Sequence, residues 1–186
     1  MIGKKNIIFG CFFFVFSAFL GGIMVNMIQT TVGDAQKTKQ EEVGRIQNFK
    51  ANDFEEDLQK LDAEKIAKAN TDGLLAMNTW LNAWDGVSQI RNAHAHGNLE
   101  SLLNIVVGIL LAFLSVSKLW KQLISWSFLL GAICHGGALF LFNFAGQQWA
   151  YDFILKWGVG PILILLGLVL TGAAVVKGFN GKLADS

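Results

Sequence analysis

Four long apolar segments constrain this chain more than any other feature of its sequence. They cover residues 7–28, 99–117, 123–144 and 157–176. Each is close to the roughly 20 residues that an α-helix needs to cross the hydrocarbon layer of a bilayer. The chain is 53% hydrophobic and 16% charged, whereas soluble domains carry about 25% charged residues. The apolar runs are continuous rather than alternating, unlike the strands of a membrane β-barrel. We therefore predict an all-α fold, a four-transmembrane-helix bundle with a helical extracytoplasmic segment between helices 1 and 2.

The changes in composition predict three regions. Residues 1–28 form an N-terminal transmembrane helix, residues 29–98 a polar helical extracytoplasmic segment, and residues 99–186 a three-helix membrane region with a short cytoplasmic tail. We expect the polar segment to cover the bundle or to lie on the membrane surface.

Two amphipathic helices are expected within the polar segment. The first runs from Asp53, as its N-cap, to Lys68, with one apolar face made of Phe54, Leu58, Leu61 and Ile66. Asn70-Thr71-Asp72-Gly73 is interpreted as a break. The second helix runs from Leu74 to Ile90.

Lysines in the short flanks predict the orientation. They precede the first apolar segment, separate the second from the third, and follow the fourth: Lys4 and Lys5, Lys118 and Lys121, Lys177 and Lys182. All three pairs fall on one side of a four-span chain, with Lys156 as the exception, and the side rich in lysine is cytoplasmic. We predict a multi-pass protein of a bacterial-type cytoplasmic (inner) membrane with both termini cytoplasmic. A net charge of +1 gives no case for nucleic-acid binding, so the expected partner is the lipid bilayer.

The candidate site lies where the second apolar segment begins. His96, Glu100 and Asn104 are spaced i, i+4, i+8, so they share one face of a helix. His94 lies half a turn before His96, and the two cannot point the same way. The third histidine, His135, lies inside the third apolar segment. Ionisable residues at membrane depth are costly, and they call for a partner, a cofactor or a water-filled cavity.

Several chemistries can use such residues, and the sequence leaves them open. Imidazole is a good axial ligand for haem iron, which would be held non-covalently because the chain has no CxxCH motif. Two histidines and a carboxylate can also bind a non-haem metal. Histidine and glutamate can relay protons. Alternatively, these side chains hydrogen-bond one another or backbone carbonyls, only to hold the bundle together.

Short motifs in the second half resemble the styrene-oxide-isomerase-like membrane proteins, which are compact four-helix proteins. Asn92-Ala93-His94 matches the segment that opens their second helix. The third apolar segment matches in outline at Leu129-Leu130-Gly131, at Gly136-Gly137 and at Phe140-Leu141-Phe142-Asn143-Phe144. The resemblance covers about residues 89–177. Family positions that carry an asparagine, an aspartate and a tyrosine fall near Glu100, Gly131 and Leu139 here.

The resemblance implies a b-type haem with His94 as the axial ligand, in a trimer with haem near the subunit interface. In the family, ferric iron is a Lewis acid that polarises an epoxide, and a hydride shift gives an aldehyde. His135, as a second ligand, would make the iron six-coordinate. The expected haem-binding set is therefore His94, His96, Glu100, Asn104 and His135, with His94 and His135 as metal ligands. The alternative function is a non-catalytic accessory or structural subunit of a larger membrane complex, and a small transporter is the weakest hypothesis.

Overall fold

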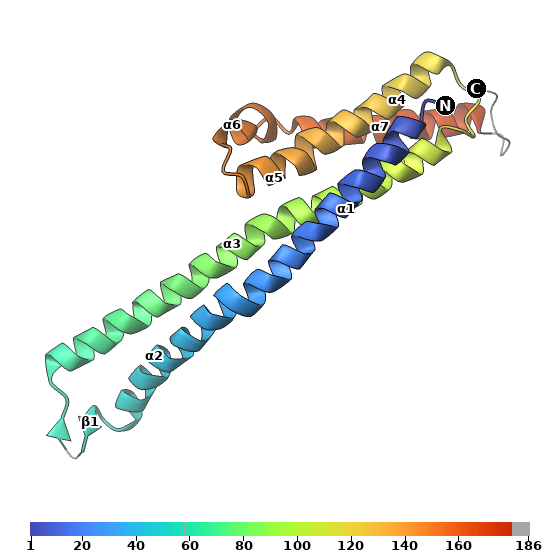
Figure 1. The fold of residues 1–186 in the computed structure, drawn as a ribbon. Coiled ribbons are helices and arrows are strands. Elements are labelled where there is room, and N and C mark those ends of the chain that lie inside the picture. Colours follow the sequence, from blue (N-terminus) through green and yellow to red (C-terminus); the bar gives the residue numbers. More distant parts are fainter. Residues whose placement is uncertain (58, 180–186) are drawn as a thin grey trace. The chain divides into compact units, whose positions relative to one another are not determined.

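The chain is built almost entirely from helices, which confirms the predicted all-α class. A computed structural model describes residues 1–57 and 59–179, so Leu58 and Lys182 lie outside the described residues. In chain order the elements are α1 (Lys4–Met27), the π-helix η1 (Ile28–Val32), α2 (Gly33–Ala51), β1 (Glu55–Glu56), β2 (Gln59–Lys60), α3 (Ala63–Leu110), α4 (Lys118–Ala132), the π-helix η2 (Ile133–Gly137), α5 (Ala138–Asn143), α6 (Gln148–Ala150), the π-helix η3 (Tyr151–Leu155) and α7 (Val159–Gly178) (Figure 1).

Three of the described helices are long and apolar enough to cross a membrane. They are the continuous helices Lys4–Ala51 and Lys118–Asn143, and α7, Val159–Gly178. These contain the predicted spans 7–28 and most of 123–144 and 157–176. The predicted second span is not among them. Histidine, asparagine and glutamate between residues 94 and 104 lower the mean hydropathy of the end of α3.

The chain divides into two compact units, Met1–Gly22 with Gln89–Ser186, and Ile23–Ser88. In the first unit, α1 and the end of α3 run antiparallel and approach closely through small residues. A Cβ added to Gly3 would collide with the backbone of Gly108, and one added to Gly10 would lie 2.6 Å from the Ser101 carbonyl oxygen. Small residues are what allow helix backbones to meet in this way in a membrane.

Hydrogen bonds from side chains to backbone carbonyls join the other helices of the first unit. Asn104 of α3 donates from Nδ2 to the Phe128 carbonyl of α4 at 3.1 Å, and Trp120 of α4 donates from Nε1 to the Leu170 carbonyl of α7 at 3.2 Å. Within this unit, α1, the end of α3, α4 and α7 alternate in direction along the chain (Figure 1). Their shared apolar core consists of Val107, Leu111, Leu114, Ile124, Phe128 and Ala174.

The predicted end of the second span, residue 117, is wrong, because helix α3 ends at Leu110. The chain leaves the helix through a turn at residues 111–113, and Leu114 then forms an antiparallel bridge with Phe179. The Ser115 amide donates to the Gly178 carbonyl at 2.7 Å. Leu114 is fully buried, so burial of this side chain and pairing with the end of α7 stabilise the extended conformation over another helical turn.

The second unit contains a hairpin of two helices, α2 and the first part of α3, with a core of Val32, Ala35, Ala83 and Val87. The predicted helix from Asp53 to Lys68 is wrong in its first part, because among its described residues only 63–68 are helical, at the start of α3. Asp53, Phe54 and Asp57 have positive φ angles, and β1 and β2 form an antiparallel pair. The helix begins at Ala63, and its cap is Asp62, whose Oδ1 accepts from the Lys65 amide at 2.6 Å.

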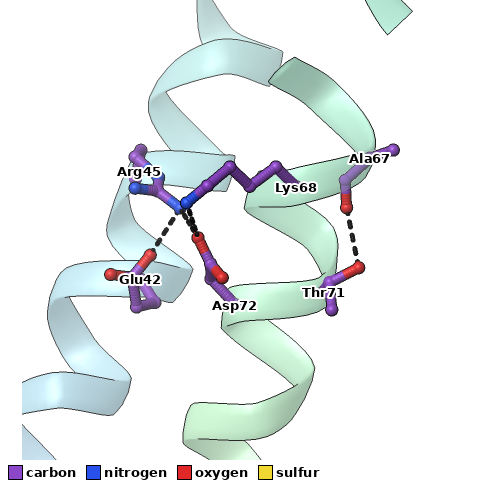
Figure 2. A network of polar contacts seen from close by, with 6 residues as sticks. All are labelled: Glu42, Arg45, Ala67, Lys68, Thr71 and Asp72. Carbon is purple, nitrogen blue, oxygen red and sulfur yellow. Dashed lines mark hydrogen bonds and ion pairs between the residues drawn. The ribbon is translucent and has the colours of Figure 1, made fainter. Parts of the chain in front are cut away.

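The predicted break at residues 70–73 is also wrong, because these residues lie inside α3. Figure 2 shows the contacts that occupy them. Arg45 of α2 lies 2.7 Å from Glu42 and 2.9 Å from Asp72, and Lys68 lies 3.3 Å from Asp72. Gly73 allows α2 to approach, since a Cβ there would lie 2.6 Å from Cδ1 of Ile46. The residues that suggested a turn instead join two helices.

These ion pairs predict a small effect of pH on the hairpin. The hydrogen bond from Arg45, with help from Lys68, holds the pKa of the Asp72 carboxyl below its ordinary range. A lowered pKa stabilises the folded hairpin above the unfolded pKa of about 3.9, and this contribution is lost as pH falls through the folded value. We expect hydrogen-exchange protection of α2, corrected for intrinsic rates, to fall below about pH 4 in wild type by roughly fivefold at most, since exposed pairs contribute little. Asp72→Asn should remove that pH dependence; an unchanged profile in the variant would contradict this role for Asp72.

Candidate metal centre

A buried carboxylate joins α3 to the π-helix η2. Glu100 of α3 is only 2% exposed. Its Oε1 lies 2.6 Å from Nδ1 of His135, and its Oε2 accepts a hydrogen bond from the Gly136 amide at 3.0 Å. Both carboxylate oxygens are therefore partnered by adjacent residues of η2. The Glu100 carboxylate and the His135 imidazole belong to two different apolar segments of the sequence, and the fold brings them together at one site.

The π-helix is what presents this pair of groups to Glu100. Residues Ile133–Gly137 form one wide turn, and such turns inside α-helices are frequent at functional sites. Glycines then bring the neighbouring helices close. A Cβ on Gly136 would lie 2.7 Å from Glu100 Oε2, and a Cβ on Gly160 of α7 would lie 2.5 Å from the Cβ of His135. His135 is thus enclosed by α3 on one side and α7 on the other.

His96 completes the cluster. Its ring lies against that of His135, with centroids 4.3 Å apart and planes inclined by 50°. One ligand atom from each of His96, Glu100 and His135 can be chosen so that all three lie within 4.8 Å of one another. Glu100 is buried and His135 is 18% exposed, whereas His96 is on the more open side of the cluster. The structure therefore brings together three of the five predicted site residues.

His94 does not belong to this cluster. Its Nδ1 lies 2.7 Å from the Ser17 carbonyl oxygen of α1, which only an N–H can satisfy. With Nδ1 protonated, Nε2 is the acceptor for the Asn98 side-chain amide at 3.3 Å. The ring also packs on Gly21, where a Cβ would lie 2.7 Å from Cε1. His94 and His96 point to different neighbours, as the half-turn between them predicts. The structure pairs His135 with His96 and Glu100, and it does not bring His94 and His135 together as the predicted pair of metal ligands.

Asn104 lies in a separate buried network. Its Oδ1 accepts from Nδ2 of Asn6 at 2.9 Å, and its Nδ2 donates to the Glu100 and Phe128 carbonyls. Asn6 also donates to the Ser125 carbonyl at 3.0 Å and accepts from the Ser125 hydroxyl. These residues satisfy one another and connect α1, α3 and α4. The predicted role of Asn104 in binding a cofactor has no support in these contacts.

Three contributors were not predicted from the sequence: the backbone amide of Gly136, the carbonyl of Ser17, and Asn6. Asn6 could have been noticed as an amide at the head of an apolar segment. Ser17 acts through its backbone, and Gly136 through a π-turn, so side-chain chemistry gives no signal for either. The glycine pair Gly136-Gly137 is the single trace of that turn in the sequence.

No protein-family model matches this chain, and no curated protein or solved structure matches it. The class of the protein therefore follows from its own residues. It is an all-α protein with helices apolar enough to cross a membrane and with a histidine–carboxylate cluster between them.

Proposed function

We propose that this chain is an integral membrane protein that crosses the bilayer four times and binds a transition-metal ion at His96, Glu100 and His135. The observation that carries the proposal is the convergence of these three donors, from two helices, around a buried carboxylate. Two imidazoles and one carboxylate form a donor set suited to iron, zinc, copper or nickel, and they leave coordination positions open for a substrate.

The end of α3 is the proposed span that is added to the three apolar helices, and it is the second span in chain order. Its polar residues reduce its hydropathy, but Glu100, Ser101 and Asn104 are all buried against neighbouring helices, while Leu99, Leu102, Val106 and Ile109 are exposed. This is the pattern of a membrane helix with lipid on one side and polar contacts inside the protein. The orientation proposed is the one with the lysine-rich end in the cytoplasm.

The donor set fits a single ion better than a porphyrin. Two axial ligands of one haem lie on opposite faces of the ring, but the rings of His96 and His135 are in direct contact, with centroids 4.3 Å apart. Ligand atoms around an ion with bonds of about 2.0–2.2 Å lie roughly 3 Å apart. The donors lie within 4.8 Å of one another, so binding requires a small inward movement, for which His96, on the open side, is the best placed.

Haem b held by His94 is the second candidate, and one observation favours it. The Ser17 carbonyl fixes the tautomer of His94 so that Nε2 carries the lone pair, as outer partners of metal-binding histidines do. Asn98 Oδ1, beside this ring, is buried and has no hydrogen-bond partner among the described residues. A bound iron would have to displace the Asn98 amide. Epoxide isomerisation and a trimer remain predictions of the resemblance alone.

Metal analysis and absorption spectra of purified full-length protein separate these proposals. We expect bound metal in the wild type and in His94→Ala, and loss of it in His96→Ala and His135→Ala, with no Soret band between about 400 and 430 nm, the usual haem region. His94→Ala is a matched control because His94 lies on the same helix two residues from His96.

A Soret band that disappears in His94→Ala would overturn the ion site in favour of haem. A protein with neither metal nor pigment would overturn both and leave the accessory-subunit hypothesis. Melting temperatures of each variant in detergent show whether metal loss reflects the missing ligand or an unfolded protein.

A further inference from the structure

A second site lies at the opposite end of the first unit from the histidine cluster. There the start of α1 meets the start of α4, and a groove of about 440 Å³ is lined by Met1, Ile2, Lys4, Lys5, Ile8 and Gln122. We propose that this groove binds the headgroup of an anionic phospholipid from the cytoplasmic leaflet. The proposal rests on the proposed membrane embedding and orientation, but not on the metal.

Lys5 is held in place at this groove before any ligand binds. Its Nζ donates to Oε1 of Gln122 at 2.8 Å and lies 3.8 Å from the centroid of the Trp126 ring. A lysine ammonium has three N–H groups, so it can still donate to a phosphate. Lys4, one residue earlier, is exposed at the same groove. A pre-ordered cation and a second, exposed cation make a suitable receptor for one phosphate group.

Among the described residues, the segments around the groove carry charge of one sign. No aspartate or glutamate occurs in residues 1–33, 101–151 or 153–179. Lys118, Lys121 and Lys177 lie on the segments that meet at this end, where Ser115 pairs with Gly178. Because no carboxylate in these stretches neutralises the lysines, an external anion is the natural counter-ion. Basic pockets between membrane helices on the cytoplasmic side bind lipid headgroups in this way.

The surface next to the groove suits acyl chains. Ile8, Phe12, Val15 and Phe19 form an exposed apolar row along α1, with Phe12 74% exposed. Ile8 is itself a groove residue, so the row starts where the headgroup would bind. Trp126 of α4 is half exposed beside Lys5, and tryptophan is enriched at the headgroup level of a bilayer. A free phosphate would use the lysines alone, whereas a phospholipid uses both features.

The test is a lipid titration of full-length protein in non-ionic detergent, read by native mass spectrometry. The probes are phosphatidylglycerol and phosphatidylcholine with identical acyl chains. We expect wild type to prefer phosphatidylglycerol, and Lys4→Gln/Lys5→Gln to bind it about 25-fold more weakly, at about fivefold for each lysine near a membrane surface. Lys118→Gln/Lys121→Gln, matched in charge at the same end, should keep most of the preference, and Lys5→Arg should retain binding.

Three results would overturn the proposal. They are an equal affinity for both lipids in wild type, an unchanged preference in Lys4→Gln/Lys5→Gln, and an equal loss in Lys118→Gln/Lys121→Gln, which would indicate a diffuse cationic rim. Competition by millimolar inorganic phosphate as strong as by the lipid would show a free-anion site and would also overturn the lipid assignment. Metal content, measured in the same samples, reports separately on the histidine cluster.

Discussion

Glu100→Gln is expected to lower the affinity of the protein for a transition-metal ion by more than about a hundredfold. Loss of an outer partner of a metal ligand costs about 10–100-fold, and Glu100 is proposed as a ligand itself. Glutamine keeps the size of the side chain and one of the two acceptor oxygens, which His135 and Gly136 use separately, but it removes the negative charge from a site that is 2% exposed. Titration with a competing chelator gives the affinity.

His94→Gln serves as the control for this prediction, because His94 lies on the same helix and contacts Ser17 rather than the cluster. It should leave the affinity within the error of the titration. If Glu100→Gln and wild type bound metal equally well, the carboxylate would be no more than a hydrogen-bond acceptor for His135, and the three-donor site would be wrong.

Gly160→Ala is expected to disturb both the packing of α7 and the cluster. The new Cβ would lie 2.5 Å from Cβ of His135, 2.6 Å from its backbone nitrogen and 2.8 Å from the Cys134 carbonyl carbon. Backbone atoms cannot rotate away, so α7 or η2 must move. Overpacking of this kind costs about 1–3 kcal/mol. We expect a lower melting temperature in detergent and weaker metal binding, because His135 is displaced.

Gly172→Ala is the matched control on the same helix. Nothing lies within 4 Å of a Cβ at this position, and alanine is favoured over glycine inside a helix by up to about 1 kcal/mol. The variant should melt at the same temperature as wild type or slightly higher, with its metal retained. Equal behaviour of the two alanine variants would contradict the close contact between α7 and His135.

The membrane helices were the most predictable part of the fold. The apolar runs at residues 7–28, 123–144 and 157–176 correspond to α1, to α4 with η2 and α5, and to α7. Local composition is enough to predict these elements, because an uninterrupted apolar helix can be recognised without knowing which distant residues it contacts. The end of the second span was wrong because pairing of Leu114 with Phe179 is a contact between distant residues.

The polar segment was predicted less well, for the same reason. Asn70, Thr71, Asp72 and Gly73 are typical of a turn, but here Asp72 binds Arg45 and Gly73 packs on Ile46. Tertiary contacts outweighed the weak local preference for a break. Asp53 is not a cap because Asp53 and Phe54 have positive φ and lead into the paired strands β1 and β2, and the cap is Asp62 instead.

The candidate site was predictable in part. Spacing alone placed His96 and Glu100 on one face, and it separated His94 from His96. The contact of Glu100 with His135 joins residues 35 positions apart, and helix spacing cannot give such a pairing. Asn104 shared the predicted face, but the neighbouring Asn6 and the Phe128 carbonyl take its hydrogen bonds.

The X-ray absorption spectrum of the metal-loaded, detergent-purified protein tests the metal site most directly. We predict nitrogen and oxygen ligands at about 2.0–2.1 Å, with the outer scattering of two imidazoles. A porphyrin spectrum with four in-plane nitrogens, or an ion without any imidazole ligand, would contradict the account.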